Sequence, residues 1–203
     1  KTLLFIGFLG MTLISHSQVI FAVQSPSSIA GNYEFTWAPP SGGWGTPDFN
    51  IPGTFVEDTL MFVDDGTTGT NPQGNPISAE GCNPLVNDLT GKIAVIYRNT
   101  CEFGTKAMNA QNAGAVAAII INREPGVINM GAGTEGANVT IPVAFVSDAT
   151  GATLATEMAN GDVVVLIGNK TGLFADDAGL TPSTAMIPKA GLMPALIAQD
   201  GSE

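Results

Sequence analysis

Hydrophobic residues fall into short blocks separated by polar stretches that are rich in glycine and proline. Continuous apolar runs at 92–97 and 116–122 are typical of strands that are covered on both faces. Closer to the N-terminus, the segments 18–23 and 33–37 alternate apolar and polar positions, which indicates strands with one buried face. Further strands are predicted at 59–63, 141–146 and 162–167.

Two helices are predicted among these strands. The segment 102–113 carries small and apolar residues at helical spacing, and Gly114 follows it, as is typical of a helix C-terminus. Because this helix connects two buried runs by short links, it requires the two strands to be parallel. The second helix is predicted to extend to about Asn160, with Ser147 or Asp148 as its N-terminal cap.

Composition agrees with a β-rich domain that has many turns, because the 203 residues include 25 glycines and 13 prolines. With 44% hydrophobic and 12% charged residues, the chain has the balance of a folded globular protein. Pattern and composition together predict an α+β fold. We expect a β-rich open barrel or sandwich that contains one βαβ crossover and is flanked by two short helices.

The chain is strongly acidic, with a formal net charge of −11 and only 7 Lys and Arg residues. Such a charge disfavours binding to nucleic acids and to anionic membranes. The first 17 residues have the pattern of a signal peptide: Lys1, an apolar run over 3–14, and Ser-His-Ser before Gln18. We predict cleavage after Ser17, export, and no stable membrane insertion afterwards.

The alternative for residues 1–17 is a retained transmembrane anchor, which the shortness of the apolar run disfavours. Residues 18–168 are predicted to form the folded domain. Residues 169–203 are thin in aromatic residues and interrupted by three prolines. We interpret them as a linker or as the start of a following domain, so the chain is expected to be a fragment of a longer protein.

Histidine occurs once, at His16 inside the predicted signal peptide. Catalytic triads that need histidine, and zinc sites with histidine ligands, are therefore excluded for the mature segment. We predict no catalytic residue, no metal site and no cofactor. Asp64-Asp65 and Asp176-Asp177 offer oxygen ligands for calcium, but neither pair matches an EF-hand loop, and solvated turns are the simpler interpretation.

The two cysteines are Cys82 and Cys101. In an exported protein a single pair predicts a disulfide, with two buried thiols as the alternative.

The segment 81–167 contains a closely spaced motif. A strand ends in Arg-Asn-x-Cys-x-Phe, a Lys follows three residues later, a helix ends in Asn-Ala-x-x-Ala-Gly-Ala, and a strand begins Ile-Pro-Val. This order resembles the protease-associated (PA) domain, over about residues 18–168. The family has a glycine where this chain has Asn99, a residue that tolerates left-handed backbone angles. The matching residues are Arg98, Cys101, Phe103, Lys106, Asn109, Ala110, Ala113, Gly114, Ala115, Ile141, Pro142 and Val143.

The resemblance implies an open β-barrel or sandwich with short helices and a role that is not catalytic. PA domains occur in or beside secreted peptidases, sorting receptors and bacterial surface proteins, where they contact partner proteins or substrates, or act as a lid. The cleavage site before Gln18 and the layout that follows are similar to exported proteins of the Bacteroidetes type. A secreted or cell-surface location is therefore expected.

Two basic residues of the motif are candidate contacts. Arg98 ends a strand and is a candidate ligand contact, with a surface ion pair to Glu102 or Glu124 as the alternative. Lys106 is a second candidate, and the alternative is that it packs its stem on the domain and pairs with a carboxylate.

The glycine-rich loop 123–140 is the candidate recognition surface, because such loops on a rigid sheet often carry binding residues. Arg123 begins this loop, and Met130 is expected to form its adaptable apolar tip. The alternative is a loop that is merely flexible. A glycan partner would need an aromatic platform, for which the candidates are Tyr33, Trp37 and Trp44.

Three functions fit these observations. The first is a non-catalytic module of an exported or surface protein that contacts a protein, peptide or glycan. The second is an accessory domain of a secreted peptidase, a lid or substrate-positioning unit, whose catalytic residues lie beyond Glu203. The third is a structural subunit of an extracellular assembly, which requires that residues 1–17 are retained and buried by a neighbouring subunit.

Overall fold

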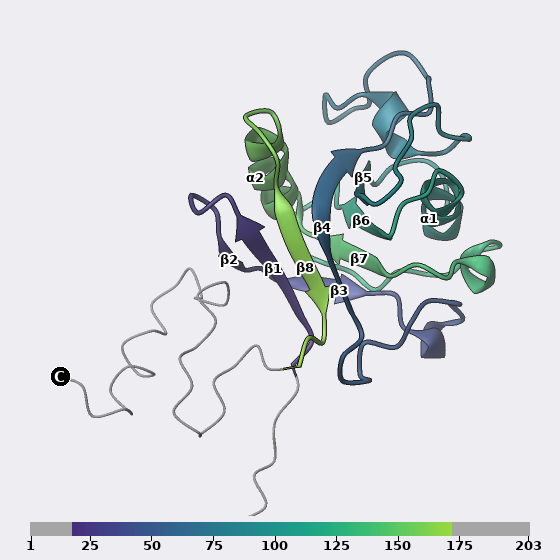
Figure 1. Cartoon of the computed structure of the whole chain (residues 1–203). Coiled ribbons are helices and arrows are strands. Elements are labelled where there is room, and N and C mark those ends of the chain that lie inside the picture. The colour runs from purple at the N-terminus through teal and green to yellow at the C-terminus, as the bar shows by residue number, and fades with distance from the viewer. Residues whose placement is uncertain (1–17, 172–203) are drawn as a thin grey trace, which may run out of the picture.

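The computed structural model describes residues 18–171; the predicted signal peptide and residues 172–203 lie outside this range. The described chain forms one curled eight-stranded sheet with two α-helices (Figure 1). In chain order the strands are β1 (Ile20–Ser25), β2 (Gly31–Asn32), β3 (Phe35–Trp37), β4 (Phe55–Phe62), β5 (Ile93–Tyr97), β6 (Ala117–Ile121), β7 (Val143–Val146) and β8 (Val164–Gly168). The helices are α1 (Phe103–Asn112) and α2 (Asp148–Met158), with short 3-10 turns η1 (Pro40–Gly42), η2 (Ile77–Glu80) and η3 (Gly136–Asn138).

The sheet is mixed, with the order β2-β1-β8-β4-β5-β6-β7-β3. Strands β4, β5, β6 and β7 are parallel to one another, and the flanking pairs are antiparallel. Strands β5 and β6 are adjacent and joined through α1, so the predicted strand–helix–strand unit is confirmed. The α+β class and the open-barrel architecture with two helices are confirmed as well.

The two edge strands, β2 and β3, lie at opposite ends of the sheet order, although only Tyr33 and Glu34 separate them in the sequence. The sheet must therefore curl until its edges approach each other. The ring centroids of Phe21 on β1 and Phe35 on β3 are 5.8 Å apart, which agrees with this curl. The single strand expected over 33–37 is therefore wrong in part. Only Phe35–Trp37 form a strand, and Tyr33 and Glu34 connect it to β2 at the other edge of the sheet.

Alternate residues of the central strands build two cores. On β5, Ile93 and Val95 join the core on the concave side of the sheet, which Leu154 of α2 also enters. Ala94 and Ile96 face the opposite side and join the core beneath α1. Both faces of the central strands are thus covered, which explains why their sequences are continuous apolar runs.

Small residues set how closely α1 approaches the sheet and the glycine-rich loop. Ala107 and Ala110 of α1 are fully buried in the core beneath it. Gly104 lies against the backbone of that loop, where a Cβ would come within 2.2 Å of the carbonyl oxygen of Ala132. The helix ends as expected, since Gly114 has a φ of +90° just after it.

The predicted capping of α2 is also confirmed, because the side chain of Ser147 accepts a hydrogen bond from the backbone N–H of Thr150 at 3.1 Å. Strand β4 begins earlier than expected, at Phe55, where it pairs with Gly168 of β8. Directly after β8, the N–H of buried Asn169 donates to the carbonyl of Thr54.

Candidate functional site

Arg98 and Asn122 follow directly after two neighbouring parallel strands. Tyr97 ends β5 and pairs with Ile121, which ends β6. The backbone N–H of Arg98 then donates to the carbonyl of Ile121 at 2.8 Å, so this edge remains ordered beyond the strands. In open sheets with parallel strands, ligands commonly bind outside the carboxyl ends of the strands. We call the group Arg98, Asn122 and Arg123 the arginine edge.

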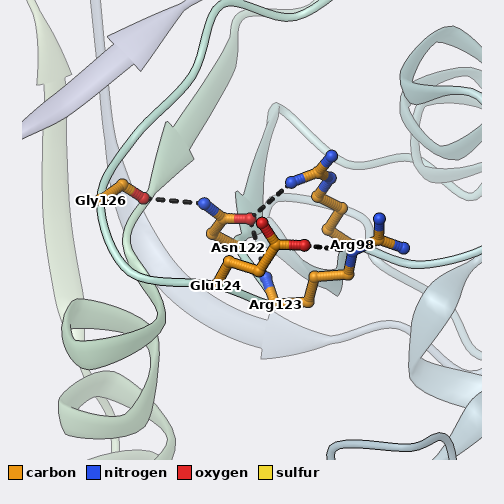
Figure 2. Close-up of polar contacts among 5 residues, drawn as sticks. All are labelled: Arg98, Asn122, Arg123, Glu124 and Gly126. Atoms are coloured by element: carbon orange, nitrogen blue, oxygen red, sulfur yellow. Dashed lines mark hydrogen bonds and ion pairs between the residues drawn. The ribbon is translucent and has the colours of Figure 1, made fainter.

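Asn122 organises the arginine edge (Figure 2). Its side chain is buried, and its Oδ1 accepts hydrogen bonds from Nη1 of Arg98 and from the backbone N–H of Arg123, both at 2.8 Å. Its Nδ2 donates to the carbonyl of Gly126 at 2.8 Å. One buried amide therefore fixes the Arg98 side chain and the start of the glycine-rich loop together.

Arg98 is held from a second direction, because its guanidinium carbon lies 5.9 Å from the ring centroid of Phe103 at the start of α1. The alternative considered for Arg98, an ion pair with Glu102 or Glu124, is not formed within residues 18–171. Glu102 instead accepts from the N–H and the hydroxyl of Thr134, and these bonds lower the pKa of its carboxyl group. Within residues 18–171, Arg98 has no carboxylate partner.

Arg123 pairs with the adjacent Glu124, with Nε and Oε1 3.2 Å apart. Both side chains are solvent-exposed, and such pairs contribute little free energy. Whether Arg98 and Arg123 contact a partner stays a prediction.

Met130 does not form an apolar tip. Its side chain is only 6% exposed and belongs to the core beneath α1, and its carbonyl accepts a hydrogen bond from Nε1 of Trp44 at 3.2 Å. The expectation of an exposed methionine is wrong because Trp44, far away in the sequence, packs under the loop. The loop 123–140 is thus partly anchored.

The three aromatic residues considered for a glycan do not form one exposed platform. Trp44 is buried, and Trp37 packs on Phe49 with centroids 5.2 Å apart. Tyr33 meets Phe21 edge to face and donates its hydroxyl to the carbonyl of Ile29. Trp44 belongs to the core beneath α1, and Tyr33 and Trp37 pack at the margin of the concave core.

Asp65 is buried and accepts hydrogen bonds from the backbone N–H groups of Thr67, Cys82 and Asn83, at 3.0, 3.0 and 3.1 Å. Burial raises its pKa, but the side-chain hydrogen bond with Thr67 and these backbone bonds together outweigh burial and hold the pKa below its usual value. No group of three or more His, Cys, Asp or Glu in residues 18–171 is arranged to hold a metal ion. Asp176-Asp177 lies outside the described residues.

The predicted disulfide between Cys82 and Cys101 is confirmed. It ties the residue that follows Gly81 to the turn that precedes α1. Lys106 lies beside it but has no carboxylate in contact, contrary to the alternative considered for it. Its Nζ donates to the backbone carbonyl of Glu80 at 2.6 Å and lies 3.5 Å from Sγ of Cys82. Burial lowers the pKa of Lys106 to about 8, against the opposing charges of Glu80 and Asp65.

Two residues of these sites were not identified from the sequence. Asn122 is the first polar residue after a buried strand, a signal that would have placed it at the strand edge. Glu80 is only 1% exposed, and its carboxylate accepts from Asn71, Asn99 and Thr100. A glutamate in a polar, glycine-rich segment gives no sign that it is buried.

Comparison with known proteins agrees with this geometry. The PA domain family model matches residues 51–154, slightly more than half of the chain. Leucine aminopeptidase 2 of Arthroderma otae is 38% identical over 106 residues, which are 47% of this chain and 21% of that protein. Signal peptide peptidase-like 2 of Arabidopsis thaliana is 33% identical over 87 residues, covering 42% of this chain and 16% of that protein.

Among solved structures, an aminopeptidase from Aneurinibacillus sp. strain AM-1 has a similar fold, with a TM-score of 0.51 and 22% identity. The match covers 76% of this chain and 31% of that protein. The chain spans about a fifth of the length of the curated relatives it matches. No helix within the described range is long and apolar enough to cross a membrane. On the family match, the motif and the fold, the chain belongs to the protease-associated (PA) domain family.

Proposed function

We propose that residues 18–171 form a non-catalytic module of an exported or cell-surface protein, which contacts a protein or peptide through the arginine edge. The observation that carries this proposal is the state of Arg98. Its guanidinium is oriented by buried Asn122 and by the Phe103 ring, and no carboxylate of the described chain neutralises it. Such a group is held ready for an external partner.

The chemistry of arginine indicates what that partner presents. A guanidinium offers a planar fork of donors that fits a carboxylate with two hydrogen bonds. Asn122 engages Nη1 of Arg98, which leaves other donors of the fork for a ligand. Because the chain carries a net charge of −11, a partner with many acidic groups would be repelled. A peptide with a single carboxylate, such as its own C-terminus, fits better.

Arg123 supports the same surface. Its only ion pair in the described chain, with Glu124, is exposed and therefore exchangeable at small cost. Its backbone N–H and Nη1 of Arg98 both donate to Oδ1 of Asn122, so one amide positions both arginines. A glycan partner and self-assembly through residues 1–17 remain predictions without further support.

A second candidate is an accessory domain that acts beside a peptidase domain. It is favoured by the names of the relatives, which include leucine aminopeptidases and a signal peptide peptidase-like protein. Under this proposal the arginine edge would position a substrate. The gene sequence on both sides of this segment tests it, since a peptidase domain encoded there is expected and its absence would remove this candidate.

Binding of a matched pair of peptides tests the first proposal. Two fluorescent peptides of one sequence, without acidic side chains, would end in a free carboxylate or in an amide. The full chain is expected to prefer the acid form, and Arg98→Gln should weaken its binding about tenfold, the loss of about 1.4 kcal/mol. Lys92→Gln is the matched control and should bind as the wild type does. Equal binding of both peptides, or of Arg98→Gln and wild type, would reject the proposal.

A further inference from the structure

The two sulfurs of the disulfide have different surroundings. Sγ of Cys82 lies 3.5 Å from Nζ of Lys106 and 3.5 Å from Oγ1 of Thr100. Apart from the disulfide itself, Sγ of Cys101 has no polar contact within residues 18–171. Both cysteines are half-buried, and the two chain neighbours of Cys101, Thr100 and Glu102, are exposed. The bond is therefore reachable from solvent and chemically asymmetric.

Lys106 is a buried cation that no carboxylate touches. Its side chain is 0% exposed, and its Nζ donates to the backbone carbonyl of Glu80 rather than to a carboxylate oxygen. The Glu80 carboxylate accepts from neutral donors, including Thr100, and that of Asp65 accepts from backbone and side-chain groups near Cys82. The ammonium thus has donor capacity left beyond this bond, and Sγ of Cys82 lies within its reach at 3.5 Å.

We propose that Cys101 is a thiol-exchange site, at which an external low-molecular-weight thiol forms a mixed disulfide while Cys82 leaves as a thiolate beside Lys106. In this step the external thiolate attacks Sγ of Cys101 and forms a new S–S bond. The Cys82–Cys101 bond breaks, and its electron pair stays on Sγ of Cys82. The external sulfur is oxidised and Cys82 is reduced. In the reverse step the Cys82 thiolate attacks the mixed disulfide and expels the external thiolate.

The stability of the leaving thiolate determines which of the two sulfurs is attacked. Exchange is faster when the sulfur that leaves forms the more stable thiolate, and a neighbouring ammonium stabilises a thiolate. The cation lies beside Cys82, so Cys82 is the sulfur that leaves and Cys101 is the sulfur that is attacked.

The domain is expected to stay folded when the bond opens. Two hydrogen bonds join the same regions without the sulfurs: Lys106 to the carbonyl of Glu80, and Nδ2 of Asn109 to the carbonyl of Gly81 at 2.9 Å. They keep the end of η2 on α1 and hold Cys82 near the mixed disulfide, so that the bond can form again. Opening should release mainly the turn 99–102.

Peptide mapping after brief exposure to reduced glutathione tests the proposal on the full oxidised chain. The reaction is quenched with acid, free thiols are alkylated, and trypsin separates Cys101, in the peptide 99–106, from Cys82, in a peptide that ends at Lys92. Glutathione is expected on Cys101 in about tenfold excess over Cys82. An equal distribution, an excess on Cys82, or no mixed disulfide would overturn the proposal.

Variants test the role of the ammonium. Lys106→Met should reduce the excess to below about twofold, because Cys82 then has no ammonium beside it. Lys92→Met is the matched control: Lys92 makes no side-chain polar contact in the described chain and should keep the full excess. If Lys106→Met does not fold, single-cysteine variants test whether Lys106 stabilises the thiolate of Cys82. The thiol of Cys82 in Cys101→Ser should alkylate at lower pH than that of Cys101 in Cys82→Ser, and identical profiles would contradict the proposal.

Discussion

Single buried polar residues determine how the basic side chains of this domain are presented. Asn122 uses its oxygen for Arg98 and its nitrogen for the loop carbonyl of Gly126. Lys106, which belongs to the same motif, is turned inward to a backbone carbonyl. The two cations of the motif are thus held in different ways, Arg98 by the side chain of Asn122 and buried Lys106 by a backbone carbonyl.

The buried Lys106 predicts a dependence of stability on pH. Its folded pKa is about 8 and its ordinary value is 10.5, so between these values the unfolded chain holds a proton that the folded chain releases. The free energy of unfolding should therefore rise with pH across this window, by at most roughly 3 kcal/mol. Urea unfolding at several pH values measures it. In Lys106→Met this rise should be missing, and parallel curves for the two proteins would contradict the expectation.

At the level of elements, close backbone approach joins α1 to the glycine-rich loop. Gly104 leaves no room for a Cβ, because backbone atoms of Ala132 and Gly136 lie within 2.2 and 2.7 Å of its ideal position. The loop is thereby fixed at its middle, and Met130 is buried beside it. Its start at Arg123 and Glu124 remains exposed.

Gly104→Ala should therefore destabilise the domain by roughly 1–3 kcal/mol, the usual cost of overpacking. This expectation is opposite to helix propensity, which favours alanine over glycine by about 1 kcal/mol inside a helix. Gly131→Ala is the control, because a Cβ there would meet nothing within 4 Å. Chemical denaturation of both variants gives the comparison, and a Gly104→Ala protein as stable as the wild type would show that the loop can move away.

The sequence patterns predicted some elements better than others, for physical reasons. Strands β5 and β6 and helix α1 are local apolar or small-residue patterns whose burial on both faces leaves few alternatives. The split between β2 and β3 depends on pairing with distant strands, which a local pattern does not contain. Likewise, the burial of Met130 depends on Trp44, a contact between positions 86 residues apart. Arg98 was identified through the motif, but the role of Asn122 was not, because one Asn after a strand is common.

In the molecule as a whole, the long segment between β4 and β5 is attached to the rest of the fold by the disulfide as well as by the two strands that flank it. That segment contains no strand and one short turn, η2, and the disulfide fastens it to the base of α1. Lys106 and Asn109 of α1 also bind this segment, because their side chains donate hydrogen bonds to the carbonyls of Glu80 and Gly81. The fold should therefore lose stability, but not its structure, when the disulfide is removed.

The double variant Cys82→Ser/Cys101→Ser measures this contribution. Closing a loop between positions 19 residues apart is expected to stabilise the folded state by about 3 kcal/mol. The variant should unfold at lower urea concentration than the oxidised wild type and keep its far-UV circular dichroism spectrum. Loss of that spectrum in the absence of urea would show that the disulfide is required for folding.

If the arginine edge contacts a carboxylate of a partner, its backbone amides should respond to that ligand. Chemical shifts of the isotopically labelled full chain, followed during titration with the peptide that has a free C-terminus, measure this response. The largest shift changes should cluster at Arg98, Asn122 and Arg123, and the amidated peptide should cause much smaller ones. Changes that cluster on another face, or that are the same for both peptides, would contradict the proposal.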